Sequence, residues 1–398
     1  MTYVAPSTVV AGQTYSAANH NIIVNDIIDH EDRLDTVQNA QYPARNVLVN
    51  GAMQFAQRAT SVTGMTSGGF VQTADRWVIA IVNAGTWTSA VSADAPTGSG
   101  FRNSLRMTCS ASGNVGASGF AFIVQKLEGQ TLQHIKKGTA SAQPLTLSFW
   151  AKGSTTGTYI CQLYDNDNAR SVSGSYTISA ADTWEQKTIT FPADTTGAFD
   201  NDNASSLEFQ MYLSAGTDRT SGTLATVWGS SVSANNAVGQ TNLSAAASRY
   251  LAVTGVQLEP GSQASPFEFV RYDDELKRCQ RYYEKSFAFD QPPVDNPSNK
   301  RGALHGRAWV TGNYTNFPSV KFSVEKRATP TIAFFNPQST TAGRCADVNS
   351  PFTAYPMTSS IGGAGATETT TGFSCVVNNS SVPSVADLSV HWTASAEL

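Results

Sequence analysis

The sequence predicts a mainly β protein of at least two domains, and three observations carry this prediction. Charged residues make up only 14% of the chain, against about 25% in an average soluble protein. From residue 46 onward, short apolar segments alternate with segments rich in Gly, Ser, Thr and Pro, which is typical of strands joined by turns. The length of 398 residues corresponds to two or three domains of about 150 residues each.

The first 45 residues differ from the rest. Pro6 and Gly12 interrupt regular structure over 1–15, which predicts an extended arm. Ser16 is suited to cap a helix from 17 to 38. The apolar side of this helix repeats in alternating steps of four and three, as in a coiled-coil seam; its residues are Ile23, Ile27, His30, Leu34 and Val37. Because so short a coil is unstable alone, we expect it to set the register of an oligomer. The alternative is a helix packed on its own domain.

Residues 46–272 predict a β-sandwich of two sheets. Strand-like segments follow one another without helical periodicity; they are 76–82, 104–110, 119–127, 145–152, 158–164, 184–191, 206–213 and 249–258. In one of them, Leu145, Leu147 and Phe149 alternate with smaller polar residues, as expected of a strand with one face in a core.

The remainder predicts a connection and a second domain. Acids at the beginning of 273–283 and bases further on complement a helix dipole, which predicts a short helix there. A proline-rich linker completes the connecting segment, 273–300. Strand-like segments then return, so 301–398 predicts a smaller β-sandwich.

Composition excludes several classes of protein. A net charge of −4 and a pI near 5.7 argue against nucleic-acid binding, which needs a basic surface. No apolar run approaches the roughly 18 residues of a membrane span, so no membrane insertion is expected. The first residues lack the basic and apolar parts of a signal peptide, so we expect synthesis and folding in a cytoplasm. The five widely spaced cysteines then predict buried, reduced thiols.

Four segments of the central region resemble the jelly-roll carbohydrate-binding modules attached to polysaccharide-degrading enzymes. They are NVLVNG at 46–51, PLTLSFWAKG at 144–153, TWEQKTITF at 183–191 and VTGVQLEPG at 253–261. The resemblance implies a jelly roll over 46–272 that binds a glycan. Such modules often hold a structural Ca²⁺ between their first and last strands. Gly255, Met53 and Gln54 depart from the usual acidic pattern there, which leaves the metal open.

A second set of segments resembles phage tail-fibre and virion-spike proteins. They are NGAMQFAQR at 50–58, TADRW at 73–77, QLEPG at 257–261, RCQRYY at 278–283, FSVEKRATPT at 322–331 and HWTASAEL at 391–398. The resemblance implies a homotrimeric fibre on the virion surface, made in a bacterial cytoplasm. The arm and helix over 1–45 would attach to other virion proteins, and the fibre would adsorb to host surface polysaccharide or capsule.

Glycan binding needs aromatic rings that stack on sugar C–H surfaces, with amide and carboxylate groups beside them. The predicted contacts are Tyr164, Trp228, Tyr159, Tyr212, Trp87, Gln162 and Asp165. For each ring the alternative is ordinary core packing, which we favour for Trp77, Phe149 and Trp184.

Two copies of Asp-Asn-Asp-Asn, at 165–168 and 200–203, carry the oxygen ligands that Ca²⁺ prefers. The alternative is Asx-turn chemistry between strands, so we predict no cofactor and leave a structural calcium open.

The sequence carries no recognisable catalytic motif of the zinc-protease, serine-hydrolase or phosphate-loop type. Three functions are therefore weighed. We favour a non-enzymatic fibre or spike that binds a glycan. The alternatives are a polysaccharide depolymerase or hydrolase, whose paired carboxylates would meet only in the fold, and a structural decoration protein without a ligand.

Overall fold

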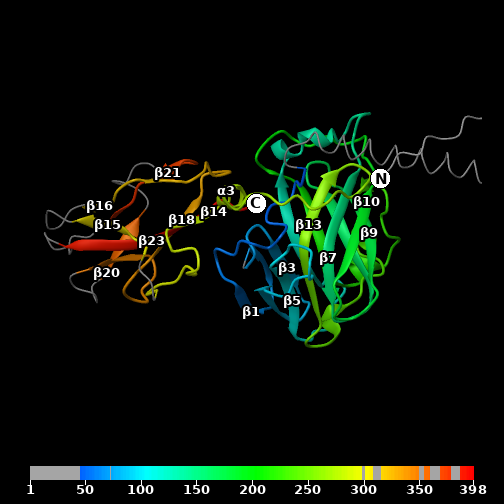
Figure 1. Cartoon of the computed structure of the whole chain (residues 1–398), viewed down its shortest axis with the longest axis horizontal. Helices are drawn as coiled ribbons and strands as arrows, with labels where there is room; N and C mark the ends of the chain where they lie inside the picture. Colours follow the sequence, from blue (N-terminus) through cyan, green and yellow to red (C-terminus); the bar gives the residue numbers. More distant parts are fainter. Residues whose placement is uncertain are drawn as a thin grey trace, which may run out of the picture.

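The computed structural model describes residues 45–71, 73–297, 301–307, 315–348, 354–358, 368–377 and 386–398. The predicted mainly β fold is confirmed, with two β domains connected through helix α3 (Tyr272–Gln280) (Figure 1). The predicted helix over 17–38 lies outside the described residues, together with its seam residues Ile23, Ile27, His30, Leu34 and Val37. Within the described part of the chain, no helix is long and apolar enough to cross a membrane.

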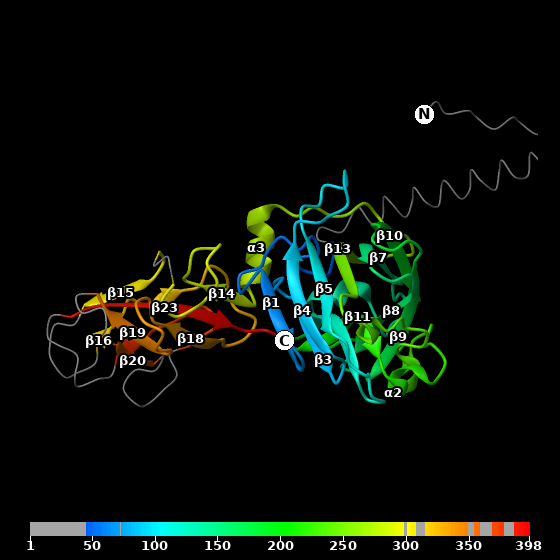
Figure 2. The same cartoon turned by 90° about the horizontal axis from the view of Figure 1, so that it is seen from below.

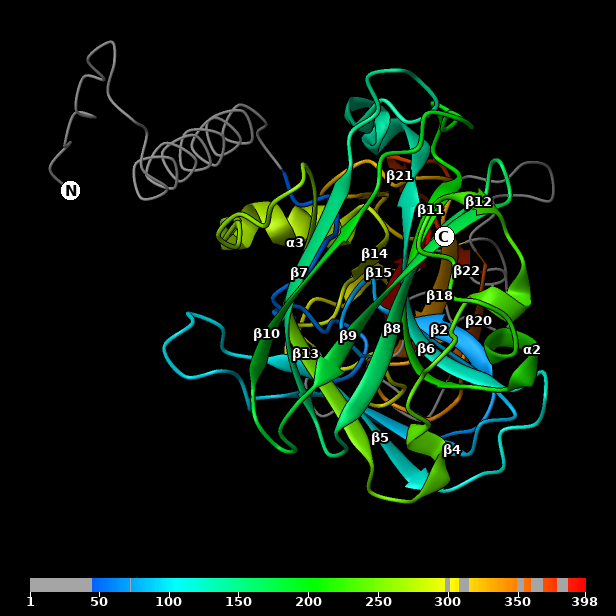
Figure 3. The ribbon, with the colours of Figure 1, turned by 90° about the vertical axis from the view of Figure 1, so that its right-hand side faces the viewer.

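The larger domain is a sandwich of two antiparallel sheets (Figure 3). The six-stranded sheet has the order β1 (Ser61–Met65), β4 (Thr86–Ser92), β5 (Ser104–Ala111), β13 (Tyr250–Pro260), β7 (Leu145–Gly153) and β10 (Glu185–Phe191). The seven-stranded sheet has the order β12 (Gly229–Ser230), β9 (Arg170–Ile178), β8 (Gly157–Asp165), β11 (Ser205–Ala215), β6 (Phe120–Glu128), β3 (Val78–Val82) and β2 (Gly68–Val71). The order β5-β13-β7-β10 opposite β6-β11-β8-β9 is typical of jelly rolls.

Alternation along the strands builds the core between these sheets. Leu145, Leu147 and Phe149 are buried in it, as predicted from their spacing. Trp77 is also fully buried, and its indole N–H donates to the carbonyl oxygen of Asn50 at 3.0 Å. A buried indole needs such a partner, so this contact fixes the turn before β1 against the start of β3.

The chain between β11 and β13 makes a long excursion instead of a short turn. It contains α2 (Thr217–Thr220), β12, and the 3-10 helices η3 (Ser233–Asn235) and η4 (Leu243–Ala245). Leu224 and Ala237 from this segment pack on Ile160 and Tyr212, which lie on the outer side of the seven-stranded sheet. The segment therefore covers part of a sheet face that would otherwise be open. Two further 3-10 turns, η1 (Gly129–Thr131) and η2 (Gln133–Ile135), follow β6.

The smaller domain is also built from β-strands. They are β14 (Tyr283–Lys285), β15 (Leu304–Arg307), β16 (Thr315–Asn316), β17 (Val320–Lys321), β18 (Thr331–Phe335), β19 (Arg344–Asp347), β20 (Ala354–Thr358), β21 (Gly372–Phe373), β22 (Val376–Val377) and β23 (Asp387–Ser395). Strand β23 pairs with four of the others, β14, β15, β18 and β19. Its side chains Leu388, Val390 and Trp392 lie in the domain core. This one strand therefore organises the domain and then leads back to the larger one (Figure 2).

The two domains meet at a buried polar junction centred on Glu128, the last residue of β6. Its carboxylate is fully buried and accepts hydrogen bonds from Arg281 at 2.7 and 2.8 Å and from the Tyr282 hydroxyl at 2.5 Å. Burial by itself raises the pKa of Glu128, but the hydrogen bonds from Arg281 and Tyr282 outweigh it, so the pKa is lowered. The carboxylate is thus held ionised between the domains.

Further contacts complete this domain junction. Glu397 forms ion pairs with Arg58, at 3.1 Å, and with Arg76. The two guanidinium groups lie over aromatic rings, Arg58 over Tyr283 at 3.6 Å and Arg76 over Tyr282 at 3.5 Å from the ring centroid. A planar guanidinium group can form an ion pair through its edge and stack on an aromatic ring through its face. Each arginine therefore joins the two domains through an ion pair with Glu397 and through contact with a tyrosine ring.

The segments that resemble fibre proteins assemble at this junction. Gln57 donates from its side-chain amide to Asp75 at 2.7 Å and to the carbonyl oxygen of Tyr283 at 3.2 Å. Lys326 is buried and paired with Glu284 at 2.5 Å. Apart from Glu284, these residues come from four of the six segments, which are far apart in the sequence. The fold thus brings these segments together at the domain junction.

Removal of the buried charge at the junction is expected to destabilise the protein. Glu128→Gln leaves the partly buried Arg281 and the Tyr282 hydroxyl without an ionised acceptor, at a cost of about 3 kcal/mol. Thermal unfolding would show a lowered midpoint. Glu185→Gln is the matched control, because Glu185 pairs with Lys187 at a partly exposed site where such pairs contribute about 0–1 kcal/mol. Equal shifts in both variants would contradict this view of the junction.

The smaller domain is expected to lose stability below pH 6.5. His391 is buried, with Phe287 stacked on its ring, and burial, reinforced by the charge of His305, lowers its pKa to about 4. In the unfolded chain His391 is protonated below about pH 6.5, whereas in the folded chain it is protonated only below about pH 4. Stability is therefore present above pH 6.5 and falls by about 2 kcal/mol between pH 7 and pH 5.

Chemical unfolding at several pH values measures how the free energy of unfolding changes with pH, and this pH dependence is the slope compared below. His391→Gln should flatten it, whereas His305→Gln, which removes an exposed histidine of the same domain, should leave most of it. A slope that survives in His391→Gln would assign the loss to other groups.

Candidate binding surface

The outer face of the seven-stranded sheet presents side chains in regular rows, because every second residue of each strand points away from the core. The register of the strands sets three rows, which are Tyr164, Glu208 and Lys126; then Gln162, Gln210, Val124 and Val78; then Ile160, Tyr212, Phe122 and Ala80. The first row lies beside the domain junction, since Arg76 donates to the carbonyl oxygen of Lys126 at 2.6 Å.

Part of this face is closed by the excursion between β11 and β13. Tyr212 is fully buried beneath it, and its hydroxyl donates to the Gln162 side chain at 3.0 Å. Burial raises the pKa of Tyr212 to about 12. These two predicted glycan contacts are therefore neighbours, as a binding site requires, but the covering segment keeps both from solvent.

Next to it the face forms a groove of about 420 Å³, which we call the junction groove; three of the side chains at its floor, Val78, Phe122 and Val124, are exposed by only 9%, 8% and 2%. Its floor is apolar and consists of Val78, Ala80, Phe122 and Val124. Its rim includes the polar residues Arg58, Lys126, Glu208, Ser395 and Glu397, together with Leu398. Phe122 is held flat against Phe120, with ring centroids 4.8 Å apart, so the floor is a packed surface on rigid strands.

The charged groups at the rim of the junction groove balance one another. Lys126 lies 3.7 Å from Glu208, whose carboxylate also accepts a hydrogen bond from Gln210 at 2.8 Å. Glu397 is paired with Arg58 and Arg76. The groove therefore combines an apolar floor with many hydrogen-bonding groups and little net charge. This combination suits a ligand with one C–H face and a hydroxylated edge.

Two predicted contacts, Trp87 and Tyr159, lie in the sandwich core with no exposed surface. The Trp87 indole donates to the carbonyl oxygen of Ala84 at 2.7 Å, and the Tyr159 hydroxyl to that of Thr155 at 2.7 Å. Their strands place both side chains on the inner face of the sandwich, where the rings pack in the core. The prediction that these rings touch a glycan finds no support, and neither enters the function proposed below.

Tyr164 and Trp228 are both half-buried, but they lie in different surroundings. Tyr164 stands on the outer face beside Glu208, at the edge of the exposed rows. Trp228 packs against the sandwich core, and its indole N–H donates to the carbonyl oxygen of Pro192 at 2.9 Å. Tyr164 thus lies beside the rim residue Glu208 of the junction groove, and the buried ring of Tyr212 contacts the floor residue Phe122, with centroids 5.4 Å apart.

Asp165, the last predicted contact, is buried and holds an internal cation. The ammonium group of Lys137 lies 2.5 Å from Asp165, 3.1 Å from Asp194, and 2.6 Å from the carbonyl oxygen of Gly197. Burial alone would raise the pKa of Asp194, but hydrogen bonds from Arg170 and Lys137 lower it to about 2. Asp165 therefore serves the fold, and its charge is already neutralised.

The two Asp-Asn-Asp-Asn copies lie side by side and use Asx-turn chemistry. In the first copy Asp165 accepts the backbone N–H of Asn168 at 3.1 Å, and in the second Asp202 accepts that of Ala204 at 2.9 Å. Asp167 accepts the backbone N–H of Asp200 at 2.9 Å, which joins the two copies. Among the described residues, no group of three or more histidine, cysteine, aspartate or glutamate side chains is placed to hold a metal ion. At Gly255, a Cβ would lie 2.4 Å from the Phe101 ring, so an acidic side chain has no room there.

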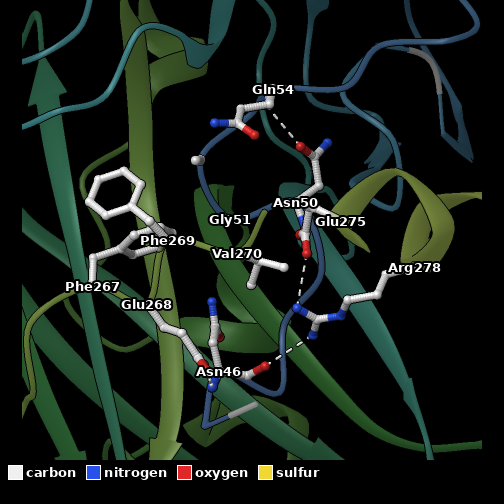
Figure 4. A pocket seen from close by; sticks show the side chains of 11 residues that line it. Asn46, Asn50, Gly51, Gln54, Phe267, Glu268, Phe269, Val270, Glu275 and Arg278 are labelled. Atoms are coloured by element: carbon white, nitrogen blue, oxygen red, sulfur yellow. Dashed lines mark hydrogen bonds and ion pairs between the residues drawn. The ribbon is translucent and has the colours of Figure 1, made fainter. Parts of the chain in front are cut away.

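Other hollows are less suited to a glycan. The pocket between the start of the sandwich and α3 holds only about 20 Å³, and Arg278 and Glu275 fill it with their ion pair (Figure 4). A hollow of about 480 Å³ lies among loops at 132–141 and 198–199, where the aromatic ring of Phe199 is buried. A shallow one of about 310 Å³ lies over β17 and β21. The junction groove alone among these four rests on a broad sheet floor.

Sequence reasoning missed most of the residues that line the junction groove. The run FAFIV at the beginning of β6 is apolar at every position, which conceals that alternate residues face the core and the groove. Arg58 was noticed only as part of a segment that resembles fibre proteins. The lysine at the end of the apolar run, Lys126, is the one local signal that this strand has a solvent-facing side.

Loss of one carboxylate from the Lys137 site is expected to destabilise the larger domain without any metal being involved. Asp165→Asn weakens the compensation of a buried ammonium, at about 2–4 kcal/mol. Asp167→Asn, in the same tetrapeptide but exposed, should cost less than about 1 kcal/mol. Thermal unfolding with and without a chelator measures both. A wild-type midpoint lowered by the chelator would show that a metal, in addition to Lys137, holds these loops.

No family model and no curated protein matches the sequence. Three solved structures are similar in part. The enzymatically active domain of tailspike protein 4 of bacteriophage CBA120 has 16% identity and a TM-score of 0.28, over 55% of this chain and 22% of that one. The N-terminal cellulose-binding domain of Cellulomonas fimi β-1,4-glucanase C has 16% identity and a TM-score of 0.25, over 47% and 90%.

The third is the family 11 carbohydrate-binding module of a Clostridium thermocellum cellulosomal cellulase, with 12% identity and a TM-score of 0.26, over 50% and 99% of the two chains. The present chain thus spans less than a quarter of the tailspike. TM-scores this low do not establish a common fold, so the function proposed next rests on the residues of this chain.

Proposed function

We propose that this chain is a non-enzymatic glycan-binding protein and that the junction groove is its binding site. The observation that carries the proposal is the pairing of a flat apolar floor with a rim of balanced polar groups. The floor residues Val78, Ala80, Phe122 and Val124 can lie against the C–H face of a sugar ring. The rim then supplies donors and acceptors to the hydroxyl groups at the ring edge.

The rigidity of the groove supports this proposal. Its floor belongs to strands β3 and β6, which are paired along five residues of each. Its rim groups are held by ion pairs and hydrogen bonds to one another. A site that is ordered before the ligand arrives loses less entropy on binding.

We propose further that the protein is a fibre or spike on a virion surface that adsorbs to host surface polysaccharide. The segments that resemble fibre proteins support this, and so does the heptad spacing predicted over 17–38. In a homotrimer, and across many copies, weak contacts at single grooves would add up to firm adhesion. The N-terminal arm would attach the fibre to other virion proteins.

A hydrolase is the second candidate, because the junction groove contains two carboxylates, Glu208 and Glu397. Glycoside hydrolysis uses one protonated and one ionised carboxyl group flanking the bond. Here each carboxylate is paired with a basic side chain, Glu208 with Lys126 and Glu397 with Arg58 and Arg76. Neither is placed as a proton donor, so binding without cleavage is the better account of this groove.

Filling the junction groove is expected to abolish glycan binding. Ala80→Arg places a long side chain on the groove floor from a half-buried position. Ala90→Arg is the matched control, because Ala90 is a half-buried alanine on a strand of the other sheet. We expect at least a tenfold loss of affinity for Ala80→Arg and none for Ala90→Arg.

The measurement is binding to an array of bacterial capsular and O-antigen polysaccharides and neutral oligosaccharides, followed by calorimetry on the best binder. Reducing ends are assayed in the same samples. Wild-type protein that binds nothing on the array would contradict the proposal. Release of reducing ends by wild type but not by Glu208→Gln would establish the hydrolase instead.

A further inference from the structure

One wall of the junction groove does not belong to the jelly roll. Ser395, Glu397 and Leu398 line the groove together with Val78 and Val124 of the sheet. Ser395 is the last residue of β23, the central strand of the smaller domain. The groove is therefore assembled from two domains, whereas its floor comes from one.

The residues that form this wall are held firmly. Arg327 donates to the carbonyl oxygens of Ala396, at 2.9 Å, and Glu397, at 3.1 Å. The Glu397 carboxylate is fixed from the other side by Arg58 and Arg76 of the larger domain. Three arginines thus position two residues, Ala396 and Glu397. The arrangement orders the wall before any ligand arrives.

We propose that residues 395–398 complete the glycan site, so that a bound glycan bridges the two domains, and that this glycan is uncharged. The inference rests on the proposed function and deepens it. The charges at the groove are paired within the chain, Lys126 with Glu208 and Glu397 with Arg58 and Arg76. A charged ligand would compete with one of these pairs, whereas hydroxyl groups can bridge them without loss.

A bridging ligand has a thermodynamic consequence. Anything that binds the docked arrangement of the domains more tightly than the separated one must stabilise docking. The glycan is therefore expected to protect the smaller domain from local opening. This holds although the groove floor that the glycan contacts belongs entirely to the larger domain. A ligand confined to the sheet would protect only the larger domain.

The test uses the full chain and the neutral oligosaccharide that binds most tightly on the array described above. Leu398→Ala removes wall surface from a residue without an ion pair, so folding is spared. We expect about fivefold weaker binding, which corresponds to the loss of roughly one buried side-chain contact. Glu397→Gln should weaken binding at least tenfold. The control is Asp387→Asn, which removes an acid from the opposite end of the same strand, where Asp387 pairs with Arg307.

Hydrogen exchange with and without the oligosaccharide supplies the second readout. Protection is expected over both 120–126 and 386–398 in the wild type, and over 120–126 alone in Leu398→Ala. Affinity should not change between low and moderate salt if the glycan is uncharged.

The outcomes separate this inference from the function on which it rests. A wild type that binds no glycan overturns the proposed function. Normal binding by Leu398→Ala and Glu397→Gln, with no protection of 386–398, leaves a glycan site on the sheet but overturns the bridging. Binding that prefers acidic polysaccharides and weakens with salt overturns the assignment to an uncharged glycan. If Glu397→Gln does not fold, Leu398→Ala decides.

Discussion

The buried carboxylate of Glu128 is the constraint on which the arrangement of this protein depends. An ionised carboxylate removed from water must be paired and hydrogen-bonded, or the fold is strongly destabilised. Here the partners, Arg281 and Tyr282, come from the segment that leads into the smaller domain. The hydrogen bonds to Glu128 therefore fix the position of Arg281 and Tyr282, where the chain enters the smaller domain. Strand β23 then returns from there and delivers Glu397 to Arg58 and Arg76.

Strand β6 links this junction to the binding surface. It ends at Glu128, and its inward side chains pack in the sandwich core, while Phe122 and Val124 form the floor of the junction groove. Floor, rim and junction are thus parts of one rigid strand and its neighbours. A change at the junction is transmitted to the groove through a few residues of β-strand. The same physical element serves stability, domain arrangement and recognition.

Sequence reasoning captured the parts of the fold that depend on local pattern. The mainly β architecture followed from turn-separated apolar segments, and the inward positions of Leu145, Leu147 and Phe149 followed from their alternation. In β11 the alternation of apolar residues with Glu208 and Gln210 places Tyr212 on the outer face of the seven-stranded sheet. In β8 both faces carry apolar side chains, so local pattern could not assign Tyr159 to the core. Nor could it foresee that the excursion after β11 buries Tyr212.

The junction groove was beyond prediction for a different reason. Its lining residues, such as Arg58, Glu208 and Leu398, are separated by more than 100 positions in the sequence, and no local spacing connects them. The resembling segments did mark several of these residues, but as signs of a protein class. Only the structure shows that they meet around Glu128 and its partners.

The most direct test of this account is a crystal structure of the full chain with the best-binding oligosaccharide. We expect a sugar ring to lie flat over Ala80 and Phe122, with its edge against the wall formed by Glu397 and Leu398. A ring seated instead among the loops around Lys136 and Phe199, or on the outer face of the six-stranded sheet, would contradict the assignment of the groove.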